Sequence, residues 1–374
     1  MNCVNLRHKL HQHPELSNVE EGTAARLVEF MTALAPDKII TGLGGTGVAV
    51  CFGDAGTGKV VMLRCELDAL PINETNTFDY KSVTPGVSHK CGHDGHMAIL
   101  AAVAKHYGAN KPKSGQVILM FQPAEETGEG AKNVLSDKLL QPLIPDYVFA
   151  LHNAPKHPLG DVIIKSGTMC CASRGLIIRF TGKTAHAAQP ETGVSPVAAI
   201  YQLLPLFEQL PLLINSKSDF TFATVVGVKV GEKAFGTAPA NGEVYVTLRS
   251  ESNVDMQSLF EYTRKKALTL ASEHGLTCDI QCEDVFDATV NHADAVSIIN
   301  KALHDEQVIT TQEPFRWSED FGQFTAKYCG ALFGLGAGEN TPALHNPDYD
   351  FPDALIEIGS RYFIKITEHC LNLK

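Results

Sequence analysis

A run of metal-binding side chains lies between residues 89 and 96. The segment His89-Lys-Cys91-Gly-His93-Asp94-Gly-His96 holds three histidines, a cysteine and an aspartate. Thiolate and imidazole groups both suit zinc or a similar borderline metal. The glycines disfavour helix before about Asp94, so we expect Cys91 and His93 at a strand-to-helix turn, where α/β folds bind ligands. The alternative is a solvated helix start capped by Asp94, and His96 is expected to be a bystander.

Two adjacent carboxylates follow a short apolar run at residues 117–121. In Gln122-Pro-Ala-Glu125-Glu126, the proline ends the strand and fixes the backbone. Neighbouring side chains on such a turn point in different directions, so one can bind a metal ion while the other takes a proton from water. A metal ion lowers the pKa of bound water towards about 7, and a nearby carboxylate completes the activation. The alternative is an exposed acidic turn.

Single polar side chains follow other predicted strands. His152 ends the apolar run 147–151, His345 follows a glycine-rich run, and Asp68 follows the strand 60–63, where it could orient a ligand. Each alone is compatible with an ordinary satisfied histidine or a solvated carboxylate. Together with the first two features they supply one cysteine, three histidines and two glutamates near predicted strand ends. A dinuclear hydrolytic centre needs about this set.

Helical and strand periodicities alternate along the first third of the chain. Residues 5–35 have helical spacing, interrupted at His13-Pro14, and residues 97–107 indicate a buried helix. The runs 48–52, 60–63, 117–121 and 147–151 indicate strands. This alternation favours an α/β layer fold with a largely parallel sheet.

The composition shifts near residue 170. Strands are indicated at 176–179, 220–230 and 243–248, and helices at 196–213 and 256–274. This pattern indicates a compact α+β unit inserted into the first domain, which resumes at about residue 288. The insert contains His186, which alone would indicate no function.

Bulk composition excludes some classes of protein. The 374 residues carry a formal net charge of −11, which disfavours nucleic acid and anionic membranes as partners, because both need a basic face. No apolar stretch reaches the roughly 18 residues of a membrane span, and the N-terminus has no signal-like apolar run. The ten cysteines are scattered, which indicates reduced thiols in a cytoplasmic protein and not a disulfide framework.

The glycines between residues 42 and 47 match a dinucleotide-binding fingerprint. Gly42-Leu-Gly44-Gly-Thr-Gly47 has the right spacing, but the fingerprint needs a helix after it. Residues 48–52 indicate a strand, so we expect these glycines to form a turn and not a nucleotide site.

Taken in order, the motifs resemble the amidohydrolase branch of the aminoacylase/carboxypeptidase metallopeptidases. That branch includes hippurate hydrolase, the plant auxin-conjugate hydrolases and N-acetyldiaminopimelate deacetylase. The resemblance covers nearly the whole chain and is carried by residues 10–16, 64–71, 91–94, 121–126, 151–152, 182–190, 318–321 and 344–351.

The resemblance implies a role for each matching position. It implies two divalent metal ions per subunit, of which zinc or manganese is favoured and nickel or cobalt would also fit. The implied metal ligands are Cys91, His93, Glu126, His152 and His345, with Cys91 bridging. Glu125 would be the general base, Asp68 would support the ligands, and His186 would stabilise the oxyanion.

The resemblance also implies a fold and a substrate. Residues 1–171 and 288–374 would form a phosphorylase/hydrolase-like α/β catalytic domain. Residues 172–287 would form an inserted α+β, ferredoxin-like lid or dimerisation domain, whose closure completes the site. In relatives that form homodimers, His186 can serve the partner subunit. The implied substrate is a small N-acyl amino acid whose amide bond is hydrolysed.

The chain departs from the pattern of this branch at three places. Glu66 stands where the branch usually has aspartate, and Thr184-Ala185 stands where glycines are common. Gly236-Thr-Ala-Pro239 replaces a segment that begins with asparagine, a change that bears on substrate preference. Two alternatives remain: a dipeptidase or carboxypeptidase of the same family, whose branches use a bridging aspartate, and a non-catalytic binding relic, which would not need Glu125.

Overall fold

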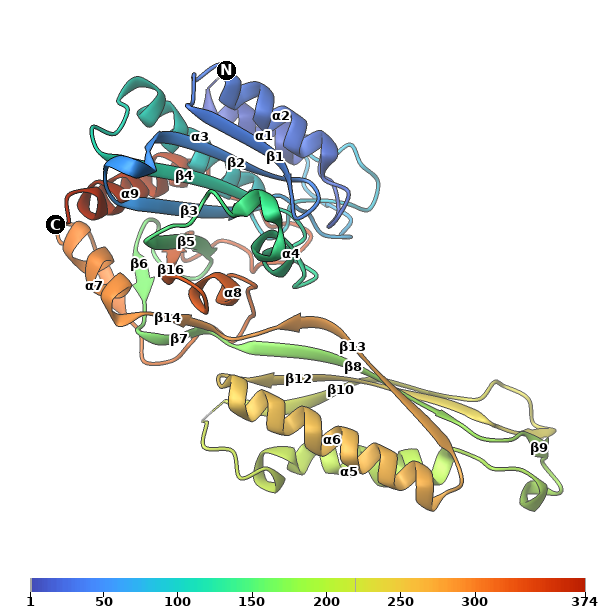
Figure 1. Cartoon of the computed structure of the whole chain (residues 1–374). Coiled ribbons are helices and arrows are strands. Elements are labelled where there is room, and N and C mark those ends of the chain that lie inside the picture. The colour runs from blue at the N-terminus through green and yellow to red at the C-terminus, as the bar shows by residue number, and fades with distance from the viewer. Residues whose placement is uncertain (1, 219, 374) are drawn as a thin grey trace. The chain divides into compact units, whose positions relative to one another are not determined.

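The computed structural model describes residues 2–218 and 220–373, and contacts divide these into two compact units. The first contains the chain up to Met169, Thr289–Pro314 and the chain from Glu319 onward, and the second contains Cys170–Ala288 and Phe315–Ser318. In Figure 1 the blue and red segments, from opposite ends of the chain, belong to the same unit. The first unit is therefore discontinuous in sequence.

An eight-stranded sheet forms the centre of the first unit. Its four central strands β4, β3, β5 and β16 run parallel, whereas β1 and β2 pair antiparallel at one edge. The central strands are buried on both faces, as parallel sheets require. This arrangement confirms the predicted α/β class with a mostly parallel sheet. The strand order is β1 (Lys38–Leu43), β2 (Gly47–Asp54), β4 (Gly115–Gln122), β3 (Val60–Glu66), β5 (Tyr147–Ala154), β16 (Cys329–Gly336), β6 (Val162–Ile164) and β15 (Val308–Thr310).

Helices pack on this sheet around one large apolar core. Val117, Leu119 and Phe121, alternate residues of β4, belong to the core that the helices share. Within it, α3 contacts both α1 and α9. The helices of this core are α1 (Cys3–Gln12), α2 (Glu21–Thr32), α3 (His93–Ala109), α7 (Ala293–Ala302) and α9 (Ala354–Leu371). The remaining elements of the unit are α4 (Gly130–Ser136), α8 (Gly322–Thr325), β7 (Gly167–Cys170), β14 (Thr289–Asn291) and the 3-10 turns Ala55–Thr57 and Lys138–Leu140.

Two long connections without helix or strand lead to the polar cluster described below. Residues 67–92 link β3 to α3, and residues 337–353 link β16 to α9. The expectation that the cysteine and the last histidine directly follow strands is therefore wrong for Cys91 and His345. Side-chain hydrogen bonds, which periodicity does not reveal, hold these connections in place.

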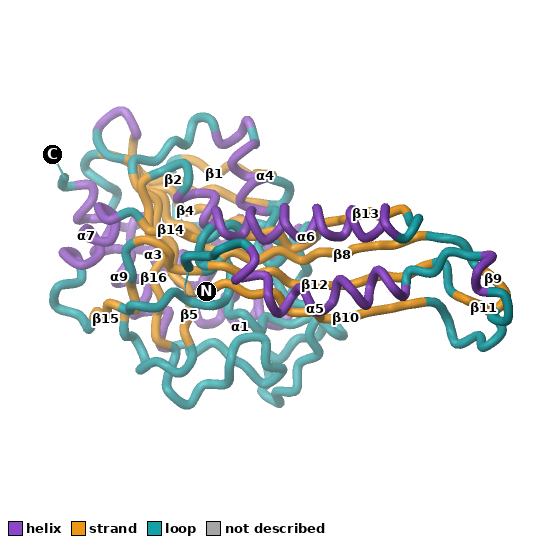
Figure 2. Tube along the Cα trace, turned by 90° about the horizontal axis from the view of Figure 1, so that it is seen from below, coloured by secondary structure: helices purple, strands orange, loops and turns teal. Residues whose placement is uncertain are grey.

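The second unit is a four-stranded antiparallel sheet covered on one face by two helices (Figure 2). Its βαββαβ sequence of elements and the strand order β10-β12-β8-β13 are those of a ferredoxin-like fold, which confirms that prediction. Its elements are β8 (Ala172–Thr181), α5 (Val197–Leu213), β10 (Thr221–Val230), β12 (Asn241–Ser250), α6 (Asn253–Glu273) and β13 (Thr277–Phe286), with the short strands β9 (Ala185–His186) and β11 (Thr237–Ala238) and the 3-10 turn Pro190–Thr192.

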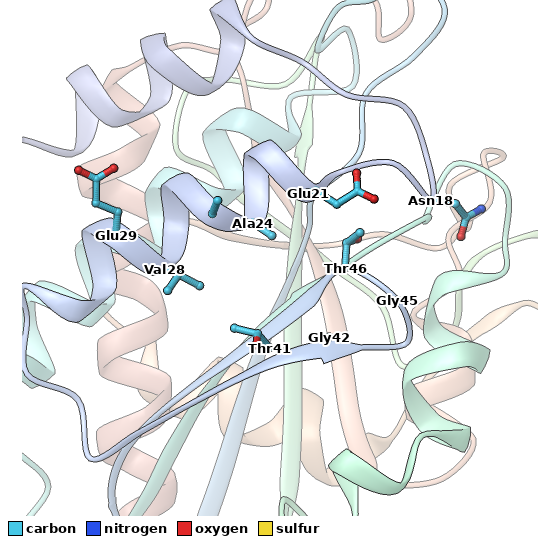
Figure 3. Close-up of a pocket in the computed structure, with 10 residues that line it drawn as sticks. Asn18, Glu21, Ala24, Val28, Glu29, Thr41, Gly42, Gly45 and Thr46 are labelled. Atoms are coloured by element: carbon cyan, nitrogen blue, oxygen red, sulfur yellow. The ribbon is translucent and has the colours of Figure 1, made fainter.

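The glycine-rich segment 42–47 makes the predicted turn: Gly44 and Gly45 lie between β1 and β2, and Gly42 and Gly47 lie in the ends of these strands. Strand β2 follows this turn, so the helix that would cradle a pyrophosphate is absent at this place. Gly42, Gly45 and Thr46 line a surface pocket together with residues of α2 (Figure 3). The volume of this pocket is about 700 Å³. Among the described residues, no helix is long and apolar enough to cross a membrane.

Candidate metal centre

Five potential ligand side chains form two groups of three that share Cys91. The ligand atoms of Cys91, His93 and His152 lie within 4.8 Å of one another, and so do those of Cys91, Glu126 and His345. Cys91 Sγ is 3.4 Å from His152 Nε2, and His345 Nε2 is 3.9 Å from Glu126 Oε2. The structure thus brings together all five residues predicted as ligands, with the thiol at the junction.

Several residues in or next to this cluster have a backbone φ angle in the positive region. Gly92 has φ 93° at the N-cap of α3, and Ala124 and His345 have φ of 50° and 65°. Residues other than glycine rarely adopt this region, and such strain gathers at functional sites. A Cβ at Gly92 would lie 2.7 Å from Asn153 Oδ1. Because Gly92 makes the turn, α3 begins at His93, one residue earlier than predicted.

Hydrogen bonds to Asp68 orient the side chain of His93 and the backbone of Glu126. His93 Nδ1 lies 2.9 Å from the backbone oxygen of Asp68 and 3.6 Å from its Oδ1. Asp68 Oδ2 accepts hydrogen bonds from Ser17 Oγ at 2.7 Å and from the backbone N–H of Glu126 at 2.9 Å. Asp68 therefore links the histidine to the glutamate and directs His93 Nε2 inward, as an outer carboxylate does in metal sites.

Glu125 approaches the same histidine as its neighbour. His93 Nε2 is 3.8 Å from Glu125 Oε2 and 3.9 Å from Glu126 Oε1. Glu125 also forms a buried group with Glu319 and Asp320, whose oxygens lie within 4.8 Å of its own. No residue that the structure describes donates a hydrogen bond to the Glu125 carboxylate. The two adjacent glutamates thus share His93 as a neighbour, but only Glu126 also belongs to a group with Cys91, and Glu125 belongs to one with Glu319 and Asp320.

A buried arginine next to this cluster makes ion pairs that were not predicted from the sequence. Arg64 is fully buried and pairs with Glu66, with Asp320, and with Glu319 Oε1 at 3.0 Å. Its Nε donates to Gln122 Oε1 at 2.8 Å. The segments around Arg64 and Ser318–Phe321 were recognised as motifs, but neither was expected to form an ion pair with the other.

His96 is not the bystander that was expected. Its Nδ1 lies 2.6 Å from Glu66 Oε2, and its Nε2 lies 2.5 Å from Asn153 Oδ1. Glu66, His96 and Asn153 therefore form one buried chain of hydrogen bonds behind His152. The prediction was wrong because burial of the first turn of α3 cannot be inferred from the local spacing of glycines.

The cluster carries an excess of buried negative charge. Burial, followed by the charges of Glu319 and Glu126, raises the pKa of Glu125 well above its usual range. Burial raises the pKa of Glu126 to about 7 despite the lowering effect of His93. Burial and Glu126 also raise the pKa of the Cys91 thiol. Such groups lose much hydration, so added positive charge would stabilise their ionised forms.

His186 belongs to the second compact unit. It ends β9, where it pairs with Thr237 of β11, and its side chain is exposed. The backbone N–H of Ala188 donates to His186 Nδ1 at 3.1 Å. In the neutral ring this bond leaves the proton on Nε2, which can then donate to a ligand.

Comparison with known proteins places this geometry in a family. Residues 62–369 match the profile of peptidase family M20/M25/M40. The chain belongs to this family. The chain is 30% identical to an N-acetyldiaminopimelate deacetylase of Priestia megaterium over 98% of its own length and 97% of the relative's. It is 31% identical to a hippurate hydrolase of Campylobacter jejuni, over 96% and 94% of the two chains.

A solved structure supports the fold of the M20 chain. A dinuclear metal-binding peptidase from Bacillus subtilis superposes with a TM-score of 0.83 at 24% identity, covering 100% of this chain and 98% of the other. The family and its named relatives confirm three predictions: the resemblance, the α/β fold with its insert, and a metal-dependent amidohydrolase activity. The substrate and the metal are finer properties that these comparisons leave to experiment.

Proposed function

We propose that this M20 hydrolase cleaves the amide bond of N-acyl amino acids at two divalent metal ions. The single observation that carries the proposal is the sharing of Cys91 by two ligand groups, beside a glutamate that belongs to neither. The relatives named as a deacetylase of N-acetyldiaminopimelate and a hippurate hydrolase support an acylated amino acid as the substrate. In this proposal the segment 172–287 acts as the lid.

The residues present fit two metal ions. His93 Nε2 and Glu126 Oε1 are buried and have no hydrogen-bond partner among the described residues, although buried polar atoms normally have one. One thiolate, three imidazoles and one carboxylate suit zinc, and manganese, nickel and cobalt are also compatible with such donors. We assign Cys91, His93 and His152 to one ion and Cys91, Glu126 and His345 to the other.

Glu125 moves the proton in the proposed reaction. When bound, the ions would act as Lewis acids and make water a stronger acid. Glu125 removes a proton from this water while the water oxygen bonds to the amide carbon. It then delivers the proton to the amide nitrogen as the carbon–nitrogen bond breaks. The second proton of the water follows to the amine, so the products are a carboxylate and an ammonium group, and Glu125 is regenerated as a carboxylate.

His186 is proposed to donate a hydrogen bond from Nε2 to the oxyanion. We expect His186→Ala to lower kcat by about 10²–10³-fold, the usual cost of losing one such donor. Metal content should not change, because the side chain lies in the second unit and in neither ligand group. Steady-state kinetics and elemental analysis of the same samples test this.

The matched control for His186 is His274→Ala. His274 is a partly exposed histidine of the same unit, at the end of α6, and its loss should leave kcat unchanged. If His186→Ala and His274→Ala were equally active, His186 would have no part in the reaction.

Metal binding is expected to strengthen as pH rises. In the metal-free protein the pKa of Glu126 is raised to about 7 and that of Cys91 above its usual range. Burial lowers the pKa of His93, but hydrogen bonding to Asp68 and nearby carboxylates outweigh burial and raise it to about 10. These ligands are therefore protonated near pH 6 and must release protons to bind an ion. For each proton that must be released, the apparent affinity for the metal ion rises about tenfold per pH unit.

Zinc titrations at pH 6, 7 and 8 in competition with a chelator measure this dependence. The apparent affinity should rise at each step. An affinity that stays constant across this range would show that the ligands are already deprotonated, against the direction of the pKa shifts.

The substrate class is tested with metal-reconstituted protein and a panel of amides. The panel holds N-acetyl, N-benzoyl and indole-acyl amino acids together with dipeptides. The proposal expects kcat/KM for at least one N-acyl amino acid to exceed that of every dipeptide by about tenfold or more, a difference of about 1.4 kcal/mol in transition-state binding. Preference for dipeptides would favour the dipeptidase or carboxypeptidase alternative, and inactivity on all members would favour a binding relic.

A further inference from the structure

Lys90, the residue before Cys91, has a fully buried side chain that the proposed reaction does not use. Its ammonium group donates to Glu74 Oε1 at 2.6 Å, to Asn76 Oδ1 at 2.9 Å and to the backbone oxygen of Tyr349 at 2.8 Å. An ammonium group has three donors, so all of them are used. The Asn76 side chain also donates to the backbone oxygen of Asp348 at 3.0 Å.

These contacts fasten the connection that carries His345. The backbone N–H of His345 donates to the backbone oxygen of Lys90 at 2.9 Å, and the N–H of Thr75 donates to the backbone oxygen of Pro347 at 3.0 Å. Residues 345–349 are thus attached at both ends to Lys90, once through its backbone and once through its ammonium group. Within the part of the chain that the structure describes, this stretch contains no helix or strand of its own, and one further hydrogen bond, from the Asn153 side chain of β5 to the Tyr349 hydroxyl, reaches it.

Glu74, the acidic partner of Lys90, is itself fixed. Its Oε1 lies 3.0 Å from His11 Nε2, and its Oε2 accepts a hydrogen bond from the backbone N–H of Ser82 at 2.7 Å. The carboxylate therefore keeps partners when the lysine is removed. Glu74 thus joins Lys90 to His11 of α1 and to Ser82.

The two ligand groups differ in how they are supported. His93 is the first residue of α3, and His152 lies in β5, so regular elements hold both. His345 lies in the connection before α9, has positive φ and has a half-exposed side chain. Cys91 is common to both groups, so His345 is the ligand that distinguishes them, and its connection is the one fastened at Lys90.

We infer that Lys90 is a positioning residue that holds His345 against Cys91 and Glu126. The ion assigned to Cys91, Glu126 and His345 depends on this lysine, whereas the ion assigned to Cys91, His93 and His152 does not. This inference rests on the proposed metal centre. Because an outer partner of a metal ligand typically contributes 10–100-fold to metal affinity, loss of Lys90 makes the two sites unequal.

The test compares the zinc affinities of the wild type, Lys90→Met, His345→Ala and the double variant. Each protein is first stripped of metal with a chelator and is then titrated with zinc in competition with a chromophoric chelator. Methionine preserves the length of the lysine stem without its donors. In Lys90→Met one ion binds as in the wild type, and the other binds about 10–100-fold more weakly. In the double variant the weaker site is no weaker than in His345→Ala, because Lys90 acts through His345.

Two companion variants make the result specific. Lys59→Met removes a partly exposed lysine paired with Asp146, and in this variant both metal sites bind zinc as in the wild type. Lys90→Met combined with Glu74→Gln removes the buried carboxylate charge together with the lysine. It replaces Lys90→Met if that single variant does not fold, and the same loss at one site is expected.

Three results would overturn the inference: two ions bound at wild-type affinity by the Lys90 variants, equal weakening of both ions, or multiplied losses in the double variant. A wild type that binds no zinc, or a His345→Ala protein that binds as the wild type does, would instead overturn the metal centre on which the inference rests.

Discussion

A Glu125→Gln protein is expected to bind the same two metal ions as the wild type and to lose almost all turnover. Glutamine fills the same space, but its amide cannot take a proton from water or pass one to the leaving amine. General acid–base groups typically contribute 10²–10⁴-fold, so kcat should fall by about that factor. Glu125 belongs to neither ligand group that shares Cys91, so elemental analysis should find unchanged metal content.

The matched control for Glu125 is Glu129→Gln. Glu129 lies four residues further along the same segment and is exposed, and its carboxylate accepts a long hydrogen bond of 3.4 Å from the Asn18 side chain. Its kcat should equal that of the wild type. Substantial turnover in Glu125→Gln would contradict the assignment of Glu125 as the base, and loss of metal in that variant would make Glu125 a ligand.

A Cys91→Ala protein is expected to lose affinity for both ions at once. The thiol belongs to both groups of ligand atoms, so its removal takes one donor from each. Loss of an outer-shell partner already costs about 10–100-fold in metal affinity, and loss of a shared direct ligand should cost at least that at each site. After dialysis, the metal content should fall from two ions per chain to less than one, and amide hydrolysis should fall with it.

Cys51→Ala is the control for loss of a buried thiol. Cys51 is a buried cysteine of β2 in the same unit and belongs to no potential ligand group of the described chain. Both ions should remain. A Cys91→Ala protein with full occupancy would remove Cys91 from the ligand set. Loss of one ion alone would show that the thiol does not bridge.

The gathering of Cys91, His93, Glu126, His152 and His345 could be predicted because these residue types are chemically distinctive, and the structure groups all five around the thiol. A cysteine one residue from a histidine, and two adjacent glutamates after a proline, indicate metal and proton chemistry from spacing alone. The predicted strands at 60–63, 117–121 and 147–151 were also found, since their apolar periodicity reflects burial in one core, whereas no strand directly precedes Cys91 or His345.

Long-range ion pairs could not be predicted in the same way. Arg64 and Asp320 are 256 residues apart in the sequence and lie in hydrogen-bond contact, and Lys90 reaches Tyr349 across 259 residues. A buried lysine or arginine looks like a surface residue until its partners are known, because charged side chains are seldom buried unpaired. The backbone turns at Ala124 and His345 also have no glycine to mark them.

The most direct test of the account follows metal content and amide hydrolysis on the same samples. Chelator-stripped protein is titrated with zinc, and in parallel with manganese, and each sample is assayed with the best N-acyl amino acid of the panel. We expect no hydrolysis without metal and activity that rises with occupancy until two ions are bound per chain. Full activity in the stripped protein, or two bound ions without hydrolysis of any amide in the panel, would contradict the central claim.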